Sequence, residues 1–123
     1  MKTNSKNILI VDDNLDIVNM LEQILETRDY TIFTANNIPD AKQIYFNNEF
    51  YVVICDLSLT PYNYDGLDLI EEFKNIKNTN FIVFSGYPNY LDKEKIEKLG
   101  IKGFLHKPFT INDLFKLLDE LER

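Results

Sequence analysis

The chain has 123 residues, 45% of them hydrophobic and 27% charged, which fits one globular domain over residues 1–123 with a core large enough to fold alone. A formal net charge of −7 repels phosphate backbones and anionic lipid, which argues against nucleic acid and membrane surfaces as direct partners. The apolar runs are shorter than the ~20 residues of a membrane span and the N-terminus lacks a signal-peptide core, so we expect a cytoplasmic protein.

The first half of the chain alternates short apolar runs with amphipathic stretches. Residues 7–11 form an apolar run that ends in Asp12 and Asp13, and residues 30–35 are rich in β-branched and aromatic side chains, so both segments are predicted strands. A helix is predicted from Asn14 and a second one near Pro39, a first-turn signal. Their apolar positions are Ile17, Val18, Leu21, Ile24 and Leu25 in the first and Ala41, Ile44 and Tyr45 in the second.

The most informative stretch is residues 51–56, which read YVVICD. An apolar run without polar alternation is typical of a strand buried on both faces, as in a parallel sheet covered by helices. Asp56 is then the last residue of that strand. Because ligands bind outside the carboxyl ends of strands in open α/β sheets, Asp56 stands where a functional site is expected.

The second half of the chain continues the alternation. A third helix is predicted after Asp65-Gly66, a strand at residues 81–84 that stops at Ser85, and a weaker fourth helix that ends at Gly100. A short strand over residues 103–105 or 106 runs into Lys107-Pro108, and Thr110 with Asp113 predicts the N-terminal cap of a last helix. The third helix is expected to bury Leu69, Ile70, Phe73 and Ile76. The apolar positions are Leu91, Ile96 and Leu99 in the fourth helix and Leu114, Leu117, Leu118 and Leu121 in the last.

Five strands that alternate with five helices predict an α/β fold with a doubly wound parallel sheet. In the flavodoxin-like strand order 2-1-3-4-5, the first and third strands are neighbours at the point where the strand order reverses. We therefore expect Asp12, Asp13 and Asp56 to converge.

Three converging carboxylates need a cation, because each pair repels by about 4 kcal/mol at a separation of 4 Å and an effective dielectric constant of 20. Carboxylates suit Mg²⁺, which keeps waters that a phosphate oxygen can replace. Lys107 offers a permanent positive charge and Ser85 a hydroxyl donor. This set of groups favours phosphoryl transfer onto Asp56, because that reaction requires positioning and charge neutralisation.

The chain resembles the receiver domain of two-component response regulators over essentially its whole length. The resemblance rests on the acidic pair in LIVDDN, the strand-end Asp56, the loop that ends at Asp65-Gly66, Ser85-Gly86 and Lys107-Pro108-Phe109. It implies that Asp56 is the phosphoacceptor and that the chain is a signalling module, not a conventional enzyme. It further implies these roles: Asp13 as a direct Mg²⁺ ligand, Asp12 as a ligand through water, the Ser58 carbonyl as another ligand, Ser85 and Lys107 as phosphoryl-binding groups, and Phe104 as the switch aromatic.

The resemblance also implies the partners. The phosphoryl donor would be a sensor histidine kinase or a histidine phosphotransfer protein, and the output would pass through the face formed by the fourth helix, fifth strand and fifth helix. The receiver of the signal would be a downstream effector protein or a C-terminal output domain, with the chain a monomer or a phosphorylation-dependent dimer. A cis peptide bond is also expected at Lys107-Pro108.

Three features depart from the family pattern. The loop from Asp56 to Gly66 is about two residues longer than usual and carries Tyr62 and Tyr64. Ser58 and Tyr87 occupy positions that control access of water, and we expect Tyr87 to slow hydrolysis of the phosphorylated aspartate. Phe104 lacks the hydroxyl of a tyrosine, so it would switch by burial alone.

Two other functions fit parts of the pattern. A phosphorylation-independent interaction module would keep the same fold, but the presence of all five site residues argues against it. A Mg²⁺-dependent phosphohydrolase would need a second acid directly after Asp56, and residues 57–59 are Leu, Ser and Leu. His106, the single histidine, has no second ligand or adjacent nucleophile in the sequence, so we expect a histidine at the edge of the sheet or on the surface.

Overall fold

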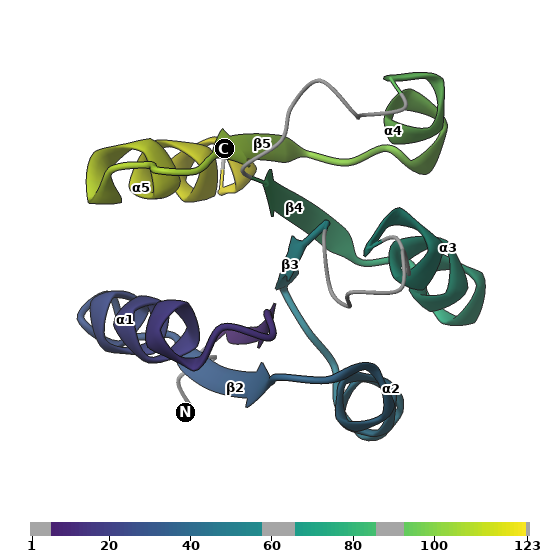
Figure 1. The fold of residues 1–123 in the computed structure, drawn as a ribbon, viewed down its shortest axis with the longest axis horizontal. Helices are drawn as coiled ribbons and strands as arrows, with labels where there is room; N and C mark the ends of the chain where they lie inside the picture. The colour runs from purple at the N-terminus through teal and green to yellow at the C-terminus, as the bar shows by residue number, and fades with distance from the viewer. Residues whose placement is uncertain (1–5, 58–65, 86–92, 123) are drawn as a thin grey trace.

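A five-stranded parallel sheet with helices on both faces makes up the part of the chain that the computed structural model describes, which is residues 6–57, 66–85 and 93–122 (Figure 1). The strands are β1 (Asn7–Val11), β2 (Thr31–Ala35), β3 (Val52–Asp56), β4 (Asn80–Ser85) and β5 (Gly103–His106). The helices are α1 (Leu15–Glu26), α2 (Ile38–Asn47), α3 (Gly66–Ile76), α4 (Lys93–Leu99) and α5 (Ile111–Leu121).

The strand order is β2-β1-β3-β4-β5, which confirms the predicted flavodoxin-like topology. β1 and β3 lie side by side at the centre with Val11 opposite Cys55, so Asp12, one residue further along, stands level with Asp56. In the next pairing Asp56 lies opposite Phe84. The register therefore sets Asp12, Asp56 and Phe84 in one row across three neighbouring strands.

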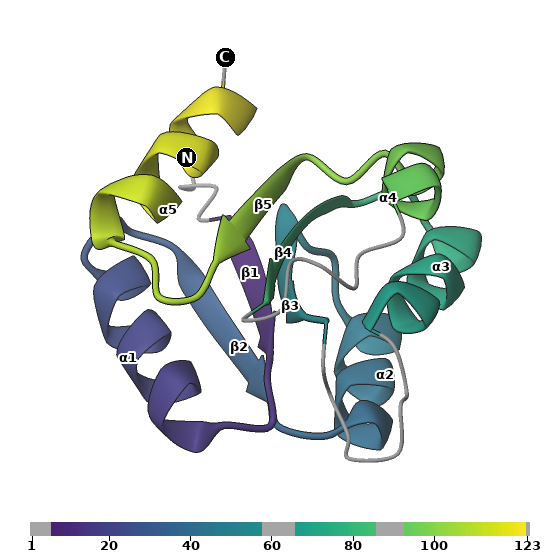
Figure 2. The same cartoon turned by 45° about the horizontal axis from the view of Figure 1, so that its top comes forward.

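The helices divide between the two faces of the sheet (Figure 2). α1 and α5 cover one face, where the core contains Ile10, Ile54, Phe84, Leu105 and Leu114 among others. α2, α3 and α4 cover the other face. β3 is buried along its whole length, as its uninterrupted apolar sequence predicts.

Local signals fix the starts of α1 and α5, the helices that follow Asp13 and Lys107 in the chain. Asn14 caps α1, because its side-chain oxygen accepts hydrogen bonds from the backbone of Asp16 and Ile17. Thr110 and Asp113 form the predicted capping box of α5. The Lys107-Pro108 peptide bond is cis, as expected.

The sequence-based assignment is wrong at one helical position and displaced at some boundaries. Ile76, expected in the core, is the last residue of α3 and is 44% exposed, because the helix ends before another turn can cover it. β3 begins at Val52 and β4 at Asn80, each one residue from the predicted start. Leu91 lies outside the described residues.

Among the described helices, none combines the length and the apolar character that a bilayer crossing requires.

Candidate functional site

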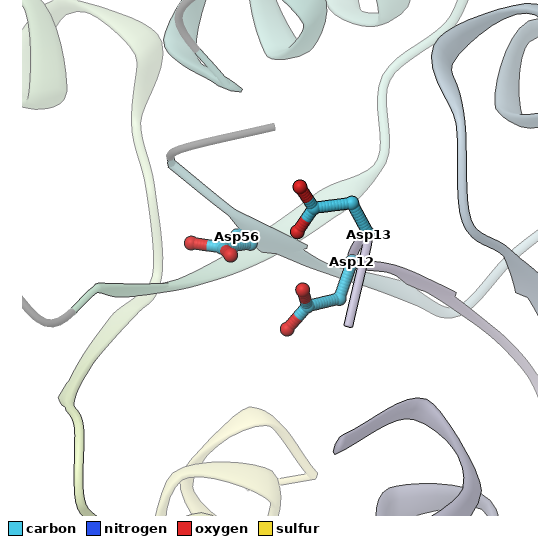
Figure 3. Close-up of side chains that lie close together, drawn as sticks. All are labelled: Asp12, Asp13 and Asp56. Atoms are coloured by element: carbon cyan, nitrogen blue, oxygen red, sulfur yellow. The ribbon is translucent and has the colours of Figure 1, made fainter. Parts of the chain in front are cut away.

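Three carboxylates meet at the carboxyl ends of the two central strands. Asp12 and Asp13 directly follow β1, and Asp56 is the last residue of β3. One oxygen from each side chain lies within 4.8 Å of the others. Figure 3 shows the three side chains leaving neighbouring strand ends and reaching into the same space. The predicted convergence is therefore present in the structure.

The three carboxylates differ in their exposure to solvent. The Asp12 residue is fully buried and Asp56 is 4% exposed, whereas Asp13 is exposed. The site thus has a buried floor, formed by Asp12 and Asp56, and one exposed acidic side chain, that of Asp13. Solvent therefore reaches the carboxylate cluster at Asp13.

Lys107 places its ammonium group between the two buried carboxylates. Its Nζ lies 3.3 Å from Asp12 Oδ2 and 3.2 Å from Asp56 Oδ2. The lysine follows β5, so it reaches over β4 to arrive there, and its side chain remains 24% exposed. The cation offsets part of the repulsion between two charges that the fold holds in a poorly solvated position.

Burial dominates the electrostatics of Asp12. It raises the pKa of this carboxyl to about 6, and the nearby Asp56 charge adds to the rise. The backbone N–H of Asn14, which donates to Asp12 Oδ1 at 2.9 Å, and the Lys107 ammonium both act in the opposite direction. The fold therefore holds Asp12 where its ionised form is disfavoured, and an additional cation would relieve this.

Gly66 fixes the backbone beside Asp56. Its N–H donates to Leu57 O at 2.9 Å, and a Cβ at this position would lie only 2.3 Å from Asp56 O. The same carbonyl accepts a hydrogen bond from the thiol of Cys55. The first residue of α3 thus packs directly on the main chain of the buried aspartate, and only glycine fits there.

The other predicted site residues are described to different extents. Ser85 is the last residue of β4 and its backbone pairs with His106, but the placement of its side chain lies outside the described part. Ser58, Tyr87 and the loop with Tyr62 and Tyr64 also fall outside it. Phe104 is half-buried in β5, packed against the core on the face of α2 to α4.

His106 is exposed, which confirms the expectation of a histidine at the edge of the sheet or on the surface. Its ring lies 4.7 Å, centroid to centroid, from that of Phe104.

Sequence reasoning missed the part of Phe84 in this site. The Lys107 Nζ lies 4.7 Å from the centroid of the Phe84 ring, so the ammonium rests on an aromatic face as well as between two acids. The residue belongs to the run FIVF, which predicts only a buried strand. Its contact with the site depends on its position opposite the strand-end Asp56, which the sequence pattern does not give.

Comparison with known proteins agrees with this geometry. The model of the response regulator receiver domain matches residues 8–119. The chain belongs to this family. A curated relative, the aerobic respiration control protein ArcA of Escherichia coli, is 32% identical over 108 residues, which is 88% of this chain and 44% of ArcA. The chain spans about half the length of the curated relatives it matches.

Solved receiver structures share the fold. A CheY-like receiver domain protein from Methanospirillum hungatei superimposes with a TM-score of 0.87 at 26% identity, covering 97% of this chain and 95% of that one. A response regulator from Burkholderia pseudomallei, solved with a phosphorylated aspartic acid, calcium ion and citrate, gives a TM-score of 0.81 at 27% identity, covering 96% and 71%. 

Membership of the family fixes the class of function. Receiver domains are phosphoacceptor signalling modules that histidine kinases phosphorylate, and they are not conventional enzymes. In this receiver domain the acidic cluster of Asp12, Asp13 and Asp56 can bind a divalent metal ion.

Proposed function

We propose that Asp56 accepts a phosphoryl group, in a Mg²⁺-dependent reaction, from a phosphohistidine of a sensor histidine kinase or a histidine phosphotransfer protein. The observation that carries this proposal is the convergence of the Asp12, Asp13 and Asp56 oxygens within 4.8 Å beside the Lys107 ammonium. A buried carboxylate at a strand end, with cationic groups around it, is suited to attack on phosphorus.

The residues present fit a magnesium ion. One oxygen of each of the three carboxylates lies within 4.8 Å of the others, so a single divalent ion could be held by them directly or through its bound waters. Exposed Asp13 would be a direct ligand, and Asp12 would act through water. The Ser58 carbonyl is a further candidate. When bound, the ion would supply positive charge beside the phosphoryl oxygens.

The transfer itself needs little from the protein except position and charge. An oxygen of Asp56 forms a bond to phosphorus in line with the bond that breaks, and the imidazole nitrogen of the donor leaves with its electron pair. Lys107 neutralises charge on the phosphoryl oxygens, and the Ser85 hydroxyl donates a hydrogen bond to one of them. 

The signal then leaves the site through a population shift. The phosphoryl group favours the arrangement in which Ser85 and Lys107 hold it, and Phe104 becomes more deeply buried in that state. The face of α4, β5 and α5 changes with it and meets an effector protein, an output domain or a second copy of the chain.

Intact mass spectrometry tests the proposal. The protein is incubated with Mg²⁺ and acetyl phosphate beside an Asp56→Asn variant, a chelator control and Asp29→Asn, which alters an exposed aspartate in the turn after α1. We expect one added phosphoryl group in the wild type and in Asp29→Asn, and none in the other two samples. A folded wild type that binds Mg²⁺ but gains no mass would contradict the proposal and favour a constitutive interaction module.

A further inference from the structure

The ammonium group of Lys107 packs on the face of an aromatic ring, that of Phe84. Its Nζ lies 4.7 Å from the centroid of Phe84, which is fully buried. The strand register explains the contact, because Phe84 stands opposite Asp56 on one side and Leu105 on the other. Lys107 follows Leu105 by two residues and therefore extends over the same face of the sheet.

The ring itself is fixed in place. Phe84 packs in the core under α1 and α5, and the Phe109 ring meets it at 6.0 Å with an interplanar angle of 75°, an edge-to-face contact. Phe109 follows the cis Lys107-Pro108 bond, so the segment that carries the lysine also packs against the ring beneath it. The ring face offers the ammonium a third favourable contact besides the oxygens of Asp12 and Asp56.

We infer that Phe84 is a positioning residue for phosphorylation, which holds the Lys107 ammonium over the Asp56 carboxylate. A lysine side chain has four rotatable bonds and loses much conformational freedom when it is fixed. The ring restricts the positions that the ammonium can take. Because the ring carries no net negative charge, it does not compete with the phosphoryl group for the ammonium. The lysine therefore stays next to Asp56 yet can turn to an incoming phosphoryl oxygen. This inference rests on the proposed function, since its kinetic consequence needs phosphorylation of Asp56.

The first measurement needs no phosphorylation. A proton above an aromatic face resonates at higher field, so the Hε signals of Lys107, assigned with a Lys107→Ala variant, should be shifted upfield of their position in the unfolded protein. Lys6 and Lys77, whose ammonium groups also lie over aromatic rings, should show such a shift as well, and Phe84→Leu should leave theirs unchanged. We expect Phe84→Leu to abolish the shift of Lys107. Phe81→Leu is the matched control, because Phe81 is equally buried in β4 but belongs to the core on the opposite face. It should leave the Lys107 signals unchanged.

The second measurement is the rate of phosphorylation from acetyl phosphate at saturating Mg²⁺. We expect Phe84→Leu to slow it by roughly 3- to 30-fold, the range that a lost cation–π contact implies, and Phe81→Leu to leave it within twofold of the wild type. Phe84→Met, which fills more of the space without a ring, replaces Phe84→Leu if that variant does not fold.

The outcomes separate the two proposals. Loss of the upfield shift with an unchanged rate would overturn the positioning role, and so would a wild-type protein without an upfield shift at Lys107. A wild type that is never phosphorylated but shows the shift would instead defeat the proposed function, leaving the contact between Phe84 and Lys107 established.

Discussion

At Asp12, the ionised carboxylate that a metal site needs lowers the stability of the folded protein. It is fully buried, it faces another carboxylate, and its pKa lies near 6 instead of the ordinary 3.8. Because the folded state raises this pKa above its unfolded value, the ionised form costs stability at neutral pH. The charge is retained at a position where an apolar or amide side chain would be more favourable for folding alone.

We therefore predict that Asp12→Asn raises the free energy of unfolding of the metal-free protein at pH 7 by about 1–3 kcal/mol. The amide oxygen can still accept the hydrogen bond from Asn14. Urea unfolding in the presence of a chelator measures the change. Asp13→Asn is the comparison, and the exposure of Asp13 predicts a much smaller effect. A destabilised Asp12→Asn protein would show that the Lys107 contact outweighs the burial of the charge.

At the scale of elements, the start of α3 is packed directly against the end of β3. The Gly66 N–H bonds to Leu57 O, and the Gly66 Cα is packed against the carbonyl of Asp56. These contacts hold residues 57 and 66 close together. A change at the helix start is therefore transmitted to the backbone of the phosphoacceptor candidate.

Gly66→Ala should lower the free energy of unfolding by about 1–3 kcal/mol or more, since backbone must move to admit the methyl group. It should also weaken Mg²⁺ binding, measured by titration calorimetry, because the main chain that carries Asp56 is displaced. Gly100→Ala serves as the control. Gly100 has a φ of 65°, so this variant should also lose stability, by roughly 1 kcal/mol, but with unchanged affinity for the ion. Equal affinities in both variants would refute the coupling.

The elements themselves were largely predictable from periodicity. The run YVVICD indicates a strand buried on both faces, and the spacing of Leu114 and Leu118 indicates the buried face of α5; both are observed. Ile76 was misassigned because a helical stripe does not say where the helix ends.

Within the site, strand ends predict the convergence of Asp12, Asp13 and Asp56, since parallel strands end at one edge of the sheet. The contact of Lys107 with Phe84 could not be predicted in the same way. It depends on the register between β3 and β4 and on the path of the lysine side chain, and neither leaves a periodic signal in the sequence.

At the scale of the whole molecule, the net charge of −7 and the repulsion within an acidic cluster that contains two buried carboxylates lower the stability of the metal-free domain. We predict that Mg²⁺ raises the melting temperature, with a gain of about 2.7 kcal/mol at 100 times the dissociation constant, or roughly 5–15 °C. Scanning fluorimetry with and without chelator measures the shift. The Asp12→Asn/Asp13→Asn double variant should lose most of it. If that variant retained the full shift, the ion would bind elsewhere.

The two ends of the described chain are in contact, at the end of β1 opposite to the acidic cluster. Lys6, just before β1, pairs with Glu122, just after α5, at 2.8 Å. Asp12 lies at the other end of β1, roughly 20 Å away along an extended strand. Lys6 and Glu122 therefore lie next to each other and far from Asp56. A change at the aspartate reaches these two residues through the body of the domain, along the length of β1 and its neighbours.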